Sequence, residues 1–288
     1  MVQCRMRIGT FMAIMTVAFL ALAQNSRVIR IDPAGENMRA FLSNMDATSE
    51  VNFARVFEIP RYQDYKPYAV LLTNGSGQAI VAVTIRWIGT SSEKTFIYDS
   101  SSDSLLRGAP GGGSSMTLPV PVPRQAPVQH GGSSMSAEGP VVLPARERML
   151  VAPGLLVSET RAKERGMPGG SASIPQSLQA AQSFSVTLDA VVLEDGTVLG
   201  PDASHTVDGL TARKAAIDGV VKAVRMAEQI GMDGVEALRI LANPQPGGNQ
   251  SLEVRLEGTI ARELMLSTRW KEQLSNMETL QLPRFHRN

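Results

Sequence analysis

The chain has 288 residues, of which 43% are hydrophobic and 19% charged, and its formal net charge is +1. This length is ample for a hydrophobic core in one or two domains. The near-neutral charge gives no long-range field that would attract nucleic acid. The single cysteine, Cys4, lies at the N-terminal end, so a chain that loses this end has no disulfide, thiol nucleophile or cysteine metal site.

Residues 1–23 are typical of a secretory signal peptide. Two arginines precede an apolar run over residues 8–20, which is followed by small residues at Ala21 and Ala23. We expect cleavage after Ala23, and loss of the two arginines changes the formal charge from +1 to −1. An exported chain without disulfides fits a bacterial periplasm or exterior. The alternative is a retained anchor, although a membrane-spanning helix needs about 20 apolar residues.

The next part of the chain begins without a clear pattern. Residues 24–50 form a leader of uncertain structure, in which residues 34–45 are compatible with one or two helical turns. Residues 53–59 alternate loosely between apolar and polar side chains and end at Pro60. This alternation predicts a first short strand.

The clearest local pattern predicts a β-hairpin. Residues 68–73 and 79–88 are two strand candidates, and Asn74-Gly75-Ser76-Gly77 lies between them. Asn and Gly tolerate the positive φ of tight turns, so Asn74 and Gly75 are expected to be structural turn residues. Four residues of the second strand are expected to face the core: Val81, Val83, Ile85 and Trp87.

A further short strand over residues 94–99 is followed by a break in the pattern. Residues 109–145 contain seven of the 17 prolines and two glycine clusters. Such a composition does not pair in a sheet or fill a core. We therefore interpret residues 109–145 as a mobile Pro/Gly-rich insertion or linker. Its polyproline segment is either a spacer or a docking site for a protein.

Strand patterns return after this insertion. Residues 147–154 predict a strand that ends in a turn. Residues 183–193 alternate well, and Asp195-Gly196 before residues 197–200 predicts a second hairpin with Asp195 and Gly196 as its turn residues. Four residues of the longer strand are expected to share one face: Phe184, Val186, Leu188 and Ala190.

Carboxylates gather around this second hairpin at Asp189, Glu194, Asp195 and Asp202. Calcium prefers oxygen ligands, so these four are the candidates for a metal site, although their spacing is not that of an EF-hand. Two of them would alternatively serve as the acid and base of a glycosidase, about 5 to 9 Å apart. The turn by itself accounts for Asp195. We therefore predict no catalytic residue, no cofactor and no metal.

The three histidines, His130, His205 and His286, lack the spacing of a metal site, and no G-x-S-x-G motif provides a serine nucleophile.

After Pro201 the apolar spacing becomes helical. A first helix is expected to be capped by Thr206 or Asp208 and to end at Gly231.

The apolar positions of this first predicted helix are Ile217, Val220, Val221, Val224, Ala227 and Ile230. A short second helix is expected over residues 232–243, and a third from Ser251 to about Leu280. The apolar stripe of the third helix packs either on its own domain or on a partner.

Two segments carry a resemblance to a known group of proteins. "PYAVLLTNGSGQAIVAVTIRW" and "LDAVVLEDGTVLGPD" resemble segments of uncharacterised secreted bacterial proteins with an immunoglobulin-like sandwich. In that group one strand pair has a turn of the type seen at Asn74, and a later pair carries the "EDG…GPD" pattern. The resemblance implies a location and a fold, and no activity.

We therefore expect a mainly β fold with a C-terminal α region. It consists of an immunoglobulin-like antiparallel β-sandwich over residues 51–202, interrupted by the insertion, and about three helices over residues 203–288. The expected function is an exported, non-enzymatic binding or scaffolding protein of the bacterial envelope. Alternatives are an extracytoplasmic hydrolase with paired carboxylates, and a surface module anchored by residues 1–23. The expected partner is a protein or envelope component, bound through the helices or the Pro-rich segment, and not nucleic acid.

Overall fold

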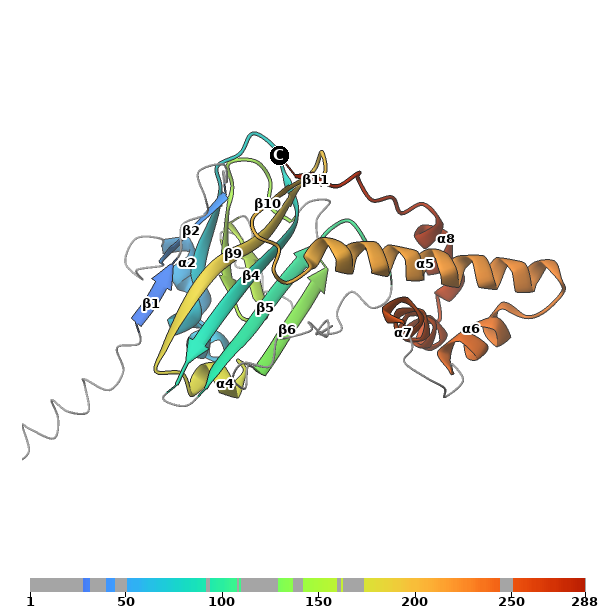
Figure 1. The fold of residues 1–288 in the computed structure, drawn as a ribbon, viewed down its shortest axis with the longest axis horizontal. Helices are drawn as coiled ribbons and strands as arrows, with labels where there is room; N and C mark the ends of the chain where they lie inside the picture. The colour runs from blue at the N-terminus through green and yellow to red at the C-terminus, as the bar shows by residue number, and fades with distance from the viewer. Residues whose placement is uncertain are drawn as a thin grey trace, which may run out of the picture.

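The structure is a computed structural model, and it describes residues 28–31, 40–44, 51–91, 94–107, 109, 129–136, 142–159, 162, 174–243 and 251–287. The expected signal peptide and the polyproline segment lie outside these residues. The described chain forms two sheets rich in antiparallel pairs, followed by helices (Figure 1).

The first sheet has seven strands within the described residues, in the order β11-β10-β9-β4-β5-β6, with β1 also beside β9. Their bounds are β1 (Val28–Ile31), β4 (Ile80–Thr90), β5 (Thr95–Asp103), β6 (Gln129–Ser136), β9 (Ser183–Leu193), β10 (Thr197–Leu199) and β11 (His286–Arg287). The central pairs β9–β4 and β4–β5 are antiparallel, whereas β1, β6 and β11 each join in parallel.

The second sheet has four strands in the order β2-β3-β7-β8, and all of its pairs are antiparallel. Their bounds are β2 (Ala40–Asn44), β3 (Val70–Asn74), β7 (Arg148–Ala152) and β8 (Leu155–Ser158). Apolar side chains of both sheets form one continuous first core, which includes Leu72, Trp87, Leu150 and Val186. Both sheets therefore contain strands from before and after the Pro/Gly-rich insertion.

The predicted hairpin of residues 68–88 is wrong, because β3 and β4 belong to different sheets. Asn74 nevertheless organises the bend that follows β3, although neither it nor Gly75 adopts the positive φ that was expected. Its side-chain Nδ2 donates to the carbonyl oxygens of Gln78, Leu143 and Pro144, and its Oδ1 accepts from Ser76. The buried Asn74 side chain thus ties the crossing between the sheets to a distant segment. The strand that follows β4 as its hairpin partner is β5, as the prediction of a strand over residues 94–99 allows.

Two irregularities in the β4–β9 pairing change which side chains face the first core. Val83, Ile85 and Trp87 face it as predicted, but a register shift after Ile80 places Val81 in a second core. The other shift leaves Asp189 without a partner on β4. The core-facing row of Phe184, Val186 and Leu188 therefore continues in Val191 and not in Ala190.

Three further segments differ from their predicted structure. Residues 53–59, predicted as a strand, lie in α2 (Val51–Ala54) and η1 (Arg55–Glu58), before η2 (Pro60–Tyr68). Phe53, Val56 and Phe57 are buried at helical spacing, so the apolar pattern fits a helix better than a strand. Within the leader, residues 40–44 form β2 and not a helical turn. Within the insertion, residues 129–136 contain no proline and pair as β6.

The described residues of the C-terminal region form four helices where three were predicted. After the short α4 (Gln176–Gln179), the chain forms α5 (Thr206–Gln229), α6 (Gly234–Ala242), α7 (Leu252–Leu266) and α8 (Trp270–Glu278). The predicted third helix is split at Ser267, whose backbone is extended. Gly231, at φ +80°, follows the end of α5 as predicted.

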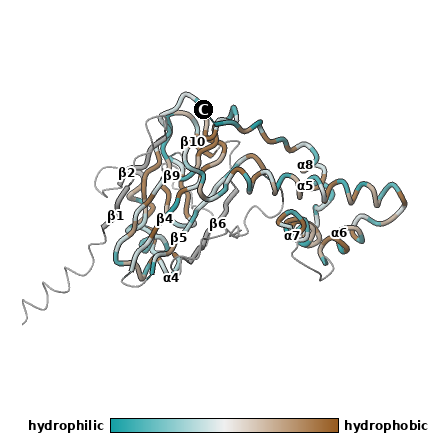
Figure 2. The backbone as a smooth tube through the Cα atoms, in the orientation of Figure 1, coloured by the Kyte–Doolittle hydropathy of each residue, from teal (hydrophilic) through white to brown (hydrophobic). Residues whose placement is uncertain are grey.

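The helix α5 extends away from the sheets, and α6, α7 and α8 gather around it (Figure 1). Apolar and hydrophilic residues alternate along α5 (Figure 2), and the apolar ones contribute to the second core. This core continues from the sheet residues Val81, Ala82, Val192 and Val198 into the four helices. Among the described residues, no helix has the length and hydrophobicity to cross a membrane.

Candidate functional site

The structure separates the four candidate carboxylates into two pairs. Glu194 and Asp195 are exposed in the turn between β9 and β10. Asp189 and Asp202 are buried, with exposed fractions of 1% and 9%, beneath the start of α5. Only the second pair is therefore part of an enclosed polar site.

The exposed pair belongs to the predicted second hairpin, which the structure confirms. Asp195 accepts hydrogen bonds from the Thr197 amide at 2.8 Å and from the Gln78 side chain at 2.9 Å. The Thr197 amide is the main reason that the pKa of Asp195 is lowered to about 2. Gly196 adopts φ +90°, a conformation that favours glycine. Turn chemistry thus accounts for Asp195 and Gly196.

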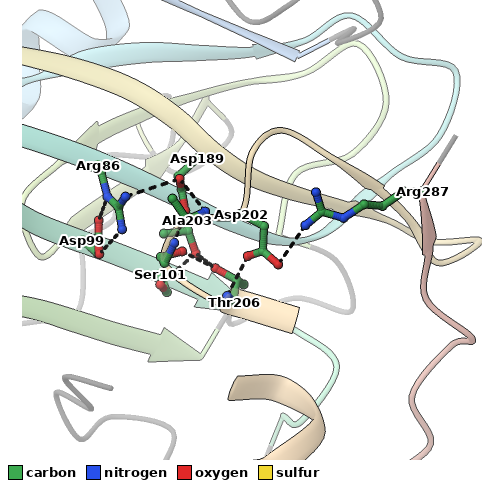
Figure 3. A network of polar contacts seen from close by, with 10 residues as sticks. Arg86, Asp99, Ser101, Asp189, Asp202, Ala203, Thr206 and Arg287 are labelled. Carbon is green, nitrogen blue, oxygen red and sulfur yellow. Dashed lines mark hydrogen bonds and ion pairs between the residues drawn. The ribbon is translucent and has the colours of Figure 1, made fainter. Parts of the chain in front are cut away.

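Asp189 occupies the register shift of β9 and points toward the start of α5 (Figure 3). Its Oδ1 accepts from the Ala203 amide at 3.1 Å, and its Oδ2 accepts from the Ser204 amide at 2.9 Å. Its main-chain carbonyl accepts from the Asp202 amide at 2.8 Å. Asp189 therefore holds the backbone that leads from the sheet into α5.

A buried arginine balances part of this negative charge. Arg86 on β4 donates from Nε and Nη2 to the two carboxylate oxygens of Asp99 on β5, at 2.7 and 2.9 Å. Its Nη1 lies 3.8 Å from Asp189. Burial alone would lower the pKa of Arg86, but the hydrogen bonds and charge of Asp99, together with Asp189 and Asp202, raise it. The arginine therefore stays charged between these carboxylates.

The N-cap position of α5 is His205 and not Thr206 or Asp208 as predicted, and the side chain that accepts from the first amide of the helix is that of Asp202. Its Oδ1 accepts from the Thr206 amide at 2.7 Å, and its Oδ2 lies 3.4 Å from Nη2 of Arg287. Burial, the largest cause, and the charge of Asp189 raise the pKa of Asp202 above 3.8, although the amides of Thr206 and Val207 and the charge of Arg287 oppose this.

A chain of hydroxyl groups completes the network. The Thr84 hydroxyl lies 2.8 Å from that of Ser101 and 2.6 Å from that of Thr206, and the Ser204 hydroxyl lies 2.8 Å from that of Thr206. These hydroxyls come from β4, β5 and the start of α5. No local motif marks them in the sequence, because each lies in a different part of the chain.

The hydrogen bonds of this network attach the start of α5 to the first sheet. Each carboxylate oxygen of Asp99, Asp189 and Asp202 already has a donor or an arginine within reach. Within the described ranges, no group of three or more His, Cys, Asp or Glu side chains could hold a metal ion. His205 contacts Asp208, and His286 contacts Thr197, whereas the His130 side chain lies outside the described structure.

A second buried ion pair, which sequence analysis missed, lies on the same side of the sheet. Nη1 of Arg213 on α5 lies 3.2 Å from Oδ2 of Asp103 at the end of β5, and both side chains are buried. The Asp103 Oδ1 accepts from the Leu106 amide at 3.0 Å. Nε and Nη2 of Arg213 are buried and have no hydrogen-bond partner in the part of the chain that the structure describes.

Substitution of Asp202 tests its role as a cap. Asp202→Ala removes the acceptor of the Thr206 amide and is expected to lower the free energy of unfolding by about 1 kcal/mol, the usual cost of a lost N-terminal cap. Asp202→Asn keeps one acceptor oxygen and removes the charge near Asp189, so at neutral pH it should be at least as stable as the wild type. Urea unfolding of the three proteins measures both effects. Equal loss in both variants would show that the charge, and not the cap, is what Asp202 contributes.

The raised pKa of Asp202 predicts how the free energy of unfolding depends on pH, and Asp202→Asn is the variant that tests it. Because the folded-state pKa of Asp202 is raised above 3.8, its stabilising contribution is complete below pH 3.8 and is lost as pH rises through the folded-state pKa. The stability of the wild type relative to Asp202→Asn should therefore fall as pH rises through this range. Unfolding curves measured across the acid range check this. A constant difference between the two proteins would contradict the raised pKa.

Exposed apolar side chains lie in another part of the chain, on the helices and in the turn between α5 and α6. The large hydrophobic residues that are exposed in the described structure all lie between residues 226 and 266: Met226, Ile230, Met232, Ile240, Val254, Met265 and Leu266. Ile230 is 78% exposed and Leu266 is 87% exposed. We call this set the apolar helical surface.

No protein-family model, no curated protein and no solved structure matches the chain. The roles of the buried network and of the apolar helical surface therefore rest on the contacts of the chain's own residues.

Proposed function

We propose that this is an exported, non-enzymatic binding or scaffolding protein of the bacterial envelope, which binds a protein partner through its C-terminal helices. The apolar helical surface is the observation that carries this proposal. Single exposed hydrophobic residues are common on any protein and need no explanation. Here they are concentrated in one region of the described chain, which supports an interaction surface.

The charges around this surface favour a protein partner over a lipid surface. Arginines on α5, α6 and next to α8 form ion pairs with glutamates three residues away: Arg225 with Glu228, Arg239 with Glu236, and Arg269 with Glu272. Anionic lipid surfaces attract basic residues whose charge is not balanced nearby. Exposed Ile, Leu and Met near three arginines whose charge is balanced therefore favour the apolar surface of another protein.

We also propose that the two sheets form an immunoglobulin-like sandwich and that the protein is exported. Two sheets with a common core, and Trp87 buried within it, support an immunoglobulin-like sandwich. The parallel additions β1, β6 and β11 depart from a purely antiparallel sandwich. The sequence of residues 1–23 supports export, and mass spectrometry of the exported protein should give Gln24 as its first residue. An N-terminus at Met1 would instead favour the anchored form.

One observation favours the alternative hydrolase. Asp202 has a raised pKa and is close enough to feel the charge of Asp189, and perturbed carboxylates of this kind occur in active sites. Their oxygens are occupied by backbone amides and arginines, however, which leaves none positioned as a general base. The contacts therefore support the binding protein over the hydrolase.

Site-specific crosslinking in the native host tests the proposed binding. A benzophenone amino acid is placed at Ile230 or Leu266 and, as a matched control, at Ala215, an exposed position nearer the start of α5. We expect one defined protein adduct from Ile230 and Leu266 and none from Ala215. Introducing Met265→Glu in the Ile230 and Leu266 proteins should remove the adduct without lowering the melting temperature. The same adducts from Ala215, or none from any position, would contradict the proposal.

A further inference from the structure

The end of the chain returns from the helices to the first sheet. After α8, residues 279–287 run back to β10 and pair with it as β11 (Figure 1). Leu280, Leu282 and Phe285 pack against the second core on the way. The chain therefore joins the helices to the first sheet at two places, the start of α5 and this C-terminal tail, in addition to the Arg213–Asp103 ion pair and the second core.

The two attachments meet at one carboxylate. Oδ1 of Asp202 accepts from the Thr206 amide at the start of α5, and Oδ2 lies 3.4 Å from the guanidinium of Arg287 in the tail (Figure 3). Asp202 is 9% exposed, so water solvates its carboxylate only weakly. Arg287 is the basic residue that the tail brings to it.

The hairpin turn before β10 is shaped to receive the tail. The His286 amide donates to the Gly196 carbonyl at 3.1 Å, and the His286 ring lies 3.1 Å from the Thr197 hydroxyl. A Cβ atom at Gly196 would clash with the Arg284 carbonyl oxygen. Gly196 thus serves both the turn and the close approach of the tail backbone.

The hold of the tail is nevertheless light. The pairing of β11 with β10 covers only two residues, and both β11 residues are exposed. The Arg287 side chain is 57% exposed, and ion pairs with an exposed partner contribute little. The polar contacts of the tail are therefore weaker than those that Asp189 and Asp202 make at the start of α5.

The attachment at the start of α5 contains a strained backbone. Asp202 and His205 adopt φ values of +52° and +56°, whereas the +95° of Gly200 is unstrained for glycine. Residues other than glycine adopt such values only when surrounding contacts hold them there, and such residues cluster at switch regions. Asp189 supplies those contacts through the amides of Ala203 and Ser204.

We propose that residues 279–287 form a latch that fixes the direction of the helices relative to the first sheet, and that its release lets α5 turn about residues 200–205. Docked on β10, the tail closes the loop between sheet and helices and balances the charge of Asp202. Undocked, it leaves residues 200–205 as the covalent connection, together with the ion pair of Arg213 with Asp103 and the apolar contacts of the second core. This inference rests on the tail, β10 and Asp202, and it is independent of any binding partner.

Distances between two spin labels test the latch. With Cys4 replaced by serine, the chain has no other cysteine, so nitroxides attach only at Lys94→Cys beside β5 and Arg255→Cys in α7. We expect one narrow distance distribution in the otherwise unchanged protein. Arg287→Glu, and deletion of residues 281–288, should broaden or shift it by several ångströms. Arg284→Glu is the matched control, because it reverses an exposed charge in the same tail without reversing the one that contacts Asp202.

Either of two results would overturn the latch. The first is an unchanged distribution after both Arg287→Glu and the deletion. The second is an equal change after Arg284→Glu, which would remove the Asp202 contact as the cause. Arg287→Glu removes no residue from the chain, so it decides the matter should the deletion lower the folded fraction measured by circular dichroism. Gly196→Ala should also broaden the distribution, whereas Gly77→Ala, with open space around its Cβ position, should not.

Discussion

Replacing Asp189 by alanine is expected to lower the free energy of unfolding by about 3–5 kcal/mol, the range for breaking a buried charged network from one side. The substitution leaves the buried amides of Ala203 and Ser204 without acceptors, and each unsatisfied group costs about 1–3 kcal/mol. It also removes one of the carboxylates near Arg86. Chemical denaturation at neutral pH measures the loss.

Asp189→Asn is the matched control for this prediction. Asparagine keeps one acceptor oxygen at nearly the same position, so its loss should be clearly smaller than that of alanine. A tolerated Asp189→Ala would mean that water reaches the two amides and that the network is an open pocket. The hydrolase alternative would then gain support, and a screen of the stable variant for lost activity would follow.

The parts of the fold that sequence predicted well are those in which neighbouring residues determine the structure. Asp195 and Gly196 make the β9–β10 turn through a side-chain cap and a positive φ, which are local properties. Gly231 follows the end of α5 for the same kind of reason. The apolar spacing of α5 is also local, because a helix buries one face whatever it packs against.

The parts that sequence predicted wrongly depend on distant partners. Two strands rich in β-branched residues on either side of Asn74 are also what a hairpin would show. Asn74 instead donates to the carbonyl oxygens of Leu143 and Pro144, about seventy residues away, and the two strands belong to different sheets. The Pro/Gly-rich composition of residues 109–145 gave no indication of β6. This strand forms at the edge of the sheet, where it needs only an extended backbone that pairs in parallel with β5.

Of the residues in the candidate site, only Asp189 and Asp202 were predicted from the sequence. Asp189 and Asp202 were identified as carboxylates near a turn, but strict alternation gave no sign that a register shift would turn Asp189 toward α5. Arg86 and Asp99 come from the two neighbouring strands, and Arg287 comes from the other end of the chain. Without the pairing of strands, nothing in the sequence joins these five residues.

The second large effect is expected at the buried pair of Asp103 and Arg213. Asp103→Asn keeps an acceptor for the Leu106 amide but removes the charge opposite Arg213, whose Nε and Nη2 already lack partners among the described residues. An unpaired buried charge of this kind costs about 3–5 kcal/mol. We therefore expect a loss of that size in the free energy of unfolding, measured by urea denaturation.

A double-mutant cycle shows whether the two charges account for that loss. Arg213→Met alone leaves the carboxylate of Asp103 buried without its cation and should also destabilise the protein. Together with Asp103→Asn it removes both charges and replaces the guanidinium with an apolar chain of similar length. The double variant should therefore be more stable than the sum of the two losses predicts, by about 1–3 kcal/mol. Additive losses would mean that solvent screens the pair, and α5 would then be held to the sheet mainly by its apolar contacts and by the network around Asp189.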